Sequence, residues 1–226
     1  MGWEGSQDVS IGYLKPLIPR ADEKLTINCN LMLLVDKSNG LQFMKHTPPL
    51  LNAVLLFILM STVSAVAEPA KFSGIIDAHN QVRAKHQLSP LTWSNSLAQY
   101  AQQWVSHLAE TQNCEMIHRP NYSDGPFQQI HGENLFWASA VELATGRSQQ
   151  QQFTPRQVVK AWADEEEFYN YETNQCQAGQ DCGHYTQMVW RESQQVGCAI
   201  AVCADKSQVW ACNYHPRGNY IGERPY

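Results

Sequence analysis

Two apolar stretches near the carboxyl end, VGCAIAVC at residues 196–203 and QVWACN at residues 208–213, decide the fold class. Both are rich in β-branched and apolar residues, and a polar turn at Asp205 to Ser207 separates them. This pattern predicts an antiparallel β-hairpin. The segments before it have helical periodicity, so the sequence predicts an α+β domain in which helices pack on a small antiparallel sheet.

Three upstream segments have apolar residues at the spacing of a helix. The first begins near Phe72 and ends before Pro90. The second has Ser94 as its predicted N-cap and extends to about Glu110. The third begins at Thr154, whose hydroxyl caps a helix with proline at its first position. Two other segments are rich in polar or turn-forming residues and are predicted to be loops: residues 114–132 and 149–152.

The length and the charge of the chain restrict the classes of function. The 226 residues accommodate one domain with an additional segment, or two small domains. The hydrophobic content of 43% suits a globular protein, and the formal net charge is -5. Proteins that bind nucleic acids usually carry clustered Lys and Arg, and no such cluster occurs in this sequence. We therefore exclude nucleic acid as a partner.

The seven cysteines are unevenly distributed along the chain. Cys29 stands alone, and the other six follow residue 110: Cys114, Cys176, Cys182, Cys198, Cys203 and Cys212. An even number of cysteines within one region indicates disulfides if the compartment is oxidising. The alternatives are a zinc site or buried thiols. The CxxC spacing typical of structural zinc sites does not occur among the six, so the sequence favours disulfides.

Residues 44–67, MKHTPPLLNAVLLFILMSTVSAVA, contain every part of a secretory signal peptide. A short basic start precedes an apolar run from Leu50 to Met60, which is too short for the roughly 20 residues of a membrane-spanning helix. The small residues of Ala65-Val66-Ala67 place cleavage before Glu68. The sequence therefore predicts a protein that is secreted to the extracellular space.

The position of this signal sets the predicted domain boundaries. A signal peptide normally lies at the amino terminus, so we expect translation to begin at Met44. Residues 1–43 are then an over-extended start that carries Cys29, and residues 68–226 form one domain. The alternative interpretation is a signal anchor over residues 50–66, preceded by a cytoplasmic tail.

Four motifs occur in a fixed order along residues 68–226. They are His79-Asn80 with Arg83 (HNxxR), GENL at residues 132–135, GHYTQMVW at residues 183–190, and CNYHPRGNYIGERPY at residues 212–226. With these motifs the chain resembles the CAP superfamily, which comprises the cysteine-rich secretory, antigen 5 and pathogenesis-related class 1 proteins and is also called the SCP domain. The six cysteines and YNYETNQC, which ends at Cys176, are most similar to the pathogenesis-related branch.

The resemblance implies an α-β-α sandwich with a small antiparallel sheet between helices, stabilised by the disulfides Cys114–Cys203, Cys176–Cys182 and Cys198–Cys212. It also implies four polar residues around an open central cleft: His118, Glu133, Glu165 and His184. The sequence leaves two of these four assignments open. His131 could replace His118, and the run of three glutamates at residues 165–167 leaves the third position uncertain by one residue.

The residue types of this cleft allow three interpretations. Two imidazoles and two carboxylates suit a divalent metal such as zinc, with His118 and His184 as the first ligands to consider and Glu133 and Glu165 beside them. The same residues suit a general acid and base. In the third interpretation, each carboxylate hydrogen-bonds an imidazole and holds helix to sheet. No cofactor is required by the sequence.

The resemblance implies a binding protein rather than an enzyme, with a sterol or a fatty acid as its ligand and with an extracellular protein or a membrane surface as a further partner. The alternatives are a metal-assisted hydrolase, such as a peptidase, that uses the four cleft residues, and an extracellular protein-interaction module. Six of the seven tryptophans lie within residues 68–226 and either line a lipid groove or belong to the core, which their spacing favours: Trp93, Trp104, Trp137, Trp162, Trp190 and Trp210.

Overall fold

The computed structural model describes residues 66–121 and 125–226. The predicted over-extended start with Cys29 and all but the last two residues of the predicted signal peptide lie outside the described residues. In the part that is described, no helix has both the length and the apolar character needed to cross a membrane.

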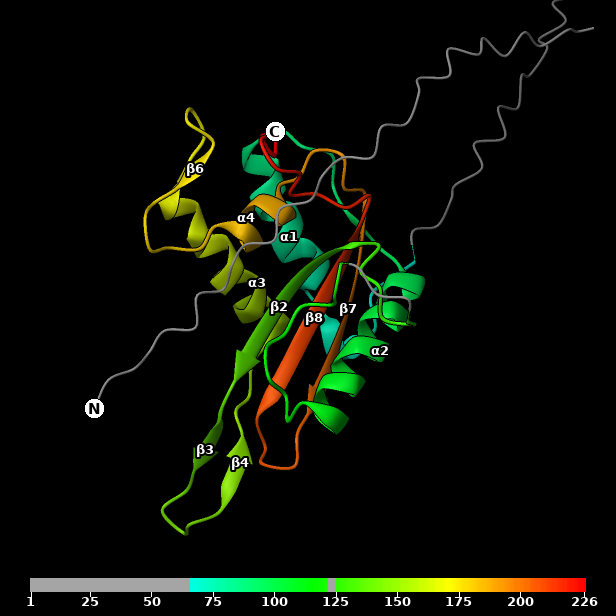
Figure 1. Cartoon of the computed structure of the whole chain (residues 1–226), viewed down its shortest axis with the longest axis vertical. Helices are drawn as coiled ribbons and strands as arrows, with labels where there is room; N and C mark the ends of the chain where they lie inside the picture. Colours follow the sequence, from blue (N-terminus) through cyan, green and yellow to red (C-terminus); the bar gives the residue numbers. More distant parts are fainter. Residues whose placement is uncertain (1–65, 122–124) are drawn as a thin grey trace, which may run out of the picture. The chain divides into compact units, whose positions relative to one another are not determined.

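A four-stranded sheet with the order β1-β7-β8-β2 lies at the centre of the described residues (Figure 1). The strands are β1 (Thr92–Trp93), β7 (Gln195–Val202), β8 (Gln208–His215) and β2 (Gly132–Ala138). Strand β1 runs parallel to β7, and the other neighbours are antiparallel. The predicted hairpin is confirmed as β7 and β8, with Cys198 directly opposite Cys212.

Helices cover both faces of this sheet (Figure 1). Helix α2 (Asn95–Thr111) packs on one face, and α1 (Ile75–Lys85), α3 (Pro155–Ala163) and α4 (Gly183–Met188) lie on the other. Side chains of β8 alternate between two core clusters. Trp210 and Tyr214 belong to the cluster with α1, α3 and α4, whereas Val209 and Ala211 belong to the cluster with α2. The described residues therefore form the predicted α-β-α sandwich.

The predicted helix starts are confirmed, whereas one predicted loop is wrong. The Ser94 side chain accepts a hydrogen bond from the Leu97 N–H, and Thr154 forms a capping box with Gln157. The polar run at residues 149–152, predicted as a loop, contributes to β4 (Ser148–Gln150), which pairs with β3 (Ala140–Glu142). This hairpin extends past the end of the sheet (Figure 1), so its strands lack the apolar alternation that marks a strand in a sequence.

The short elements complete the connections. They are the 3₁₀ helices η1 (Ala70–Phe72) and η2 (Asp164–Phe168) and the paired strands β5 (Tyr169–Asn170) and β6 (Gln175–Cys176). The described residues contain three disulfides, the same three pairs that the family resemblance implies: Cys114–Cys203, Cys176–Cys182 and Cys198–Cys212.

The tryptophans belong mostly to the core. Five of the six are buried, with 2–5% of the residue surface exposed: Trp93, Trp104, Trp162, Trp190 and Trp210. Trp137 differs, because 44% of its surface is exposed. The five buried indole rings therefore stabilise the fold and leave Trp137 as the exposed indole ring in the described part of the chain.

His79 of the HNxxR motif is completely buried in a hydrogen-bonded chain. Its Nδ1 lies 2.8 Å from the Ile75 carbonyl oxygen, and its Nε2 lies 2.8 Å from the hydroxyl of Tyr214, which in turn accepts a hydrogen bond from Asn134 Nδ2. In this arrangement Nδ1 donates to the carbonyl and Nε2 accepts from the hydroxyl, which needs a neutral imidazole. His79 therefore joins α1 to the sheet as a neutral group.

We expect the free energy of unfolding to fall as the pH drops from about 7.5 to about 4.5. Burial, aided by the Arg83 charge, lowers the pKa of His79 from 6.5 to about 4, despite the opposing hydrogen bond to Ile75. Between these pKa values the unfolded chain binds a proton that the folded protein excludes. The contribution of His79 is therefore complete above its unfolded pKa, and about 2.5 kcal/mol of it is lost at pH ~4.5.

Urea unfolding at the two pH values measures this loss. The control is His79→Gln, whose side chain can hydrogen-bond but does not titrate. Its free energy of unfolding should depend less on pH than that of the wild type. Equal pH dependence in both proteins would contradict the assignment.

Candidate functional site

His118 and Glu133 form the first of two imidazole–carboxylate pairs. His118 follows α2 and Glu133 lies on β2, with 2.9 Å between His118 Nδ1 and Glu133 Oε1. The Glu133 carboxylate also accepts hydrogen bonds from the backbone N–H of Arg119 at 3.1 Å and from Asn213 Nδ2 at 3.3 Å. Its side chain has no exposed surface, so these donors replace the water that the carboxylate loses on folding.

Arg119 supplies a positive charge beside this pair. Its side chain is fully buried, and its Nε lies 3.8 Å from Glu133 Oε2. The guanidinium donates a hydrogen bond to the Tyr100 carbonyl and lies 3.7 Å from the centre of the Tyr100 ring. The charge of Glu133 is therefore balanced inside the fold by a cation that the packing holds in place.

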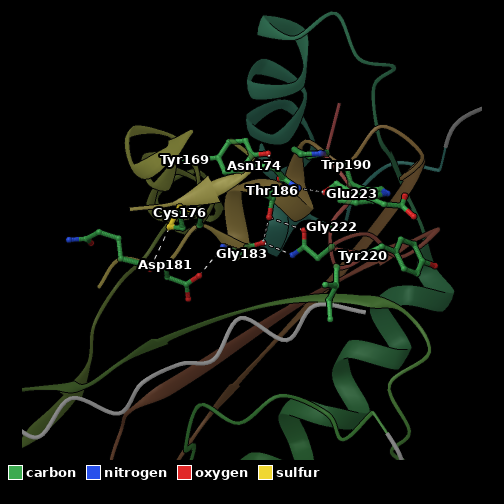
Figure 2. Close-up of a pocket in the computed structure, with 15 residues that line it drawn as sticks. Tyr169, Asn174, Cys176, Asp181, Gly183, Thr186, Trp190, Tyr220, Gly222 and Glu223 are labelled. Atoms are coloured by element: carbon green, nitrogen blue, oxygen red, sulfur yellow. Dashed lines mark hydrogen bonds between the residues drawn. A yellow bond between two sulfur atoms is a disulfide. The ribbon is translucent and has the colours of Figure 1, made fainter. Parts of the chain in front are cut away.

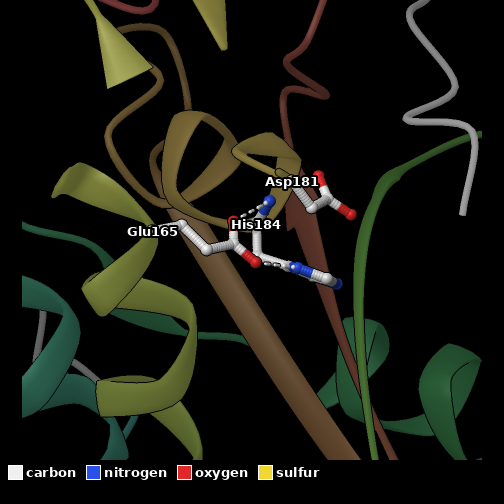
Figure 3. Close-up of side chains that lie close together, drawn as sticks. All are labelled: Glu165, Asp181 and His184. Carbon is white, nitrogen blue, oxygen red and sulfur yellow. Dashed lines mark hydrogen bonds and ion pairs between the residues drawn. The ribbon is translucent and has the colours of Figure 1, made fainter. Parts of the chain in front are cut away.

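Glu165 and His184 form the second pair (Figure 3). Glu165 lies on η2 and His184 on α4, and Glu165 Oε1 is 2.5 Å from His184 Nδ1. The other carboxylate oxygen, Oε2, accepts the backbone N–H groups of His184 and Tyr185 at 3.0 and 3.1 Å. Glu166, the next glutamate of the run, points elsewhere and pairs with Lys85 at 2.9 Å. Glu165 is therefore the glutamate of this run that contacts His184.

Both pairs have the same chemical arrangement. In each, the imidazole Nδ1–H donates to a carboxylate, so a neutral ring carries its lone pair on Nε2. Histidines that bind metals in proteins are usually oriented in this way by a carboxylate, a backbone carbonyl or a water. A neutral ring of His118 or His184 is therefore suited to coordinate a metal through Nε2.

His131, the sequence alternative to His118, has different surroundings. Its ring packs edge to face against Tyr100, with 4.9 Å between the centroids, and against His215 at 5.4 Å. Burial, followed by the charges of His215 and two arginines, lowers the pKa of His131 to about 4. The structure thus pairs His118 with Glu133 and places His131 among aromatic rings.

Asp181 joins the second pair as an unexpected neighbour (Figure 3). One ligand atom each of Glu165, Asp181 and His184 lie within 4.8 Å of one another. In the described part of the chain, no other group of three or more His, Cys, Asp or Glu residues meets this criterion. The four predicted cleft residues are thus arranged as two pairs, and the pair on α4 has an additional carboxylate.

The comparison with known families decides the classification of this chain. A family model described as CAP, the cysteine-rich secretory protein family, matches residues 76–214, which is more than half of the chain. The chain belongs to the CAP family. The matched range contains the residues of both imidazole–carboxylate pairs and most of the sandwich.

Similar CAP-family proteins occur among plant pathogenesis-related proteins. The chain is 40% identical over 177 residues to pathogenesis-related protein 1B of Nicotiana tabacum, an alignment that covers 78% of this chain and 92% of that protein. It is 41% identical over 182 residues to pathogenesis-related protein PR-1 of Medicago truncatula, with 76% and 94% covered.

Solved structures also share this CAP fold. BmVAL-1 is similar with a TM-score of 0.53 and 23% identity, over 73% of this chain and 85% of that one. Na-ASP-1 is similar with a TM-score of 0.52 and 18% identity, over 74% of this chain and 44% of that one. At such low identity these similarities concern the fold alone.

A pocket of about 320 Å³ lies beside Asp181 in this CAP domain (Figure 2). One wall is the loop closed by the Cys176–Cys182 disulfide, and the opposite wall is the segment 219–225. Asp181 belongs both to this pocket and to the group with Glu165 and His184. The pocket therefore provides space beside the Asp181 carboxylate.

Sequence reasoning missed two residues of this site, Arg119 and Asp181. Arg119 directly follows His118, and Asp181 precedes His184 by three residues. Charged residues at such positions are usually solvated, so neither position carries a signal in one sequence. Their roles depend on which distant carboxylate the fold brings to them.

Proposed function

We propose that this CAP-family chain acts outside the cell as a binding protein, rather than as an enzyme, and that its His/Glu cleft holds a divalent cation such as zinc. The observation that carries this proposal is the pairing of each cleft imidazole with a carboxylate through Nδ1. An imidazole held in this way carries its lone pair on Nε2 when neutral, and this donor chemistry fits zinc. A bound cation supplies a positive charge that polarises oxygen ligands.

Three disulfides support the extracellular location, because such bonds persist in oxidising compartments.

We also propose that the secreted chain begins at Glu68, at the start of a CAP domain over residues 68–226. The Glu68 carboxylate accepts hydrogen bonds from the N–H groups of Gly74 and Ile76 and so caps α1. N-terminal sequencing of the secreted product checks the cleavage position. The names of the plant relatives suggest a role in defence.

The apolar ligand, a sterol or a fatty acid, binds outside the cleft in this proposal. The exposed Trp137 and the half-buried Met116 both line a separate pocket of about 390 Å³. The cleft instead presents imidazoles and carboxylates, which an apolar ligand would desolvate at a cost. These features support separate binding sites for the apolar ligand and for the cation.

A double variant, His118→Ala with His184→Ala, tests both halves of the proposal. We expect zinc affinity measured by calorimetry to fall at least about tenfold, because both imidazole ligands are lost. Binding of a radiolabelled sterol should persist. The control is the exposed His215→Ala, which should leave both affinities unchanged, and thermal unfolding checks that each variant is folded.

Three results would contradict parts of this proposal. Unchanged zinc binding in the folded double variant would mean that the cation site is misplaced. Loss of sterol binding in that variant would mean that the cation and the sterol share one site. Hydrolysis of a peptide by the zinc-loaded protein, abolished in the double variant, would favour the metal-assisted hydrolase instead.

A further inference from the structure

The two imidazole–carboxylate pairs differ in charge. In the first pair, the Glu133 carboxylate lies 3.8 Å from the fully buried guanidinium of Arg119, so one negative charge meets one positive charge. In the second, Glu165 and Asp181 bring two negative charges to the His184 ring. Among the described residues, neither of these two carboxylates has an ion pair with Lys or Arg. Electrostatic attraction for a cation is therefore concentrated at the second pair.

The Asp181 carboxylate is held in place by its local structure. Its Oδ1 accepts a hydrogen bond from the Gly183 N–H at 2.8 Å, and its loop is closed by the Cys176–Cys182 disulfide. Within the described residues, its second oxygen has no hydrogen-bond partner. Figure 3 shows the Asp181 carboxylate and the His184 ring extending to the same side of Glu165. The oxygen is thus available to a ligand next to the imidazole.

Oxygen-rich sites differ from imidazole-rich sites in the cations they prefer. Carboxylates suit manganese, magnesium and calcium, whereas imidazole suits zinc and other transition metals. One carboxylate ligand and one imidazole ligand, with a second carboxylate behind the imidazole, suit a cation that accepts both donor types, such as manganese.

We propose that Asp181 is a direct ligand of the cleft cation beside the His184 ring, that Glu165 orients this ring and adds negative charge, and that manganese is among the cations bound, while the His118–Glu133 pair contributes less to the affinity. This inference rests on the proposed function, namely that the cleft binds a divalent cation. It adds Asp181 as a ligand, and it ranks the second pair above the first in its contribution to cation affinity.

Asp181→Asn is the variant that tests this inference, with manganese and zinc ions as separate probes in calorimetry on the secreted protein. The amide keeps an oxygen that can accept from the Gly183 N–H, but it removes the charge. Asp205→Asn is a matched control, because Asp205 accepts the N–H of Ser207, also two residues later, at 2.9 Å. Thermal unfolding verifies that both variants are folded. His118→Ala is measured beside them and gives the contribution of the first pair.

The expected result is a loss of manganese affinity of at least about tenfold in Asp181→Asn and a smaller loss in His118→Ala. Asp205→Asn should bind both ions like the wild type. If Asp181→Asn binds both ions normally while the His118/His184 double variant does not, the inference is wrong and the proposed function stands. If the double variant also binds normally, the proposed function fails. A larger loss in His118→Ala than in Asp181→Asn would reverse the proposed order.

Discussion

Replacing Arg83 with methionine is expected to destabilise the protein by more than about 4 kcal/mol, enough to prevent stable folding. The Arg83 side chain is completely buried and donates four hydrogen bonds to backbone carbonyls. The acceptors, at 2.8–3.0 Å, are the carbonyl oxygens of Ser89, Met188, Trp190 and Ser193. Burial lowers the pKa of Arg83 to about 10, so the guanidinium keeps its charge at neutral pH.

The size of this effect follows from the carbonyls that are left behind. A buried acceptor without a donor costs about 1–3 kcal/mol, and methionine fills the space without donating. The Ser89 carbonyl lies in the segment after α1, and the other three lie at the last residue of α4 and in the segment that follows it. Loss of these hydrogen bonds therefore separates the helix that carries His184 from α1, which carries Arg83.

Denaturant unfolding followed by circular dichroism measures the loss. Arg191→Met is the control, because Arg191 is exposed and its removal should change stability by less than about 0.5 kcal/mol. A cooperative transition in Arg83→Met at the wild-type midpoint would show that the carbonyls find other donors.

Replacing Gly197 with alanine is expected to cost about 3 kcal/mol. Gly197 lies on β7 where the first turn of α2 crosses it, and a Cβ atom there would lie 2.3 Å from the backbone N of Ala98 and 2.4 Å from the carbonyl oxygen of Ser94. Both are backbone atoms, so no side chain can rotate away. Helix α2 would have to move off the sheet, which opens the core on that face.

Gly125→Ala provides the matched control for this prediction. A Cβ atom at Gly125 would meet no atom within 4 Å, so the same chemical change should leave stability nearly unchanged. Thermal unfolding of the two variants beside the wild type makes the comparison. Equal melting temperatures for Gly197→Ala and Gly125→Ala would contradict the close approach of α2 to β7.

The local features of the fold were predictable because each depends on neighbouring residues. Two stretches rich in β-branched and apolar residues around a polar turn predicted β7 and β8. The caps at Ser94 and Thr154 predicted the starts of α2 and α3. The hairpin of β3 and β4 was missed, because it protrudes from the sheet and lacks the pattern of a half-buried strand.

The sequence by itself determined the fold class, the cysteine framework and the CAP motifs, because composition, caps and motif order are properties of short segments. Only the tertiary structure decided what the motif residues do. It buried His79 and Arg83 as structural groups, set Arg119 against Glu133, and brought Asp181 next to Glu165. Charge and hydrogen bonding at these sites depend on residues that are distant in sequence, and packing alone brings such residues within a few ångströms.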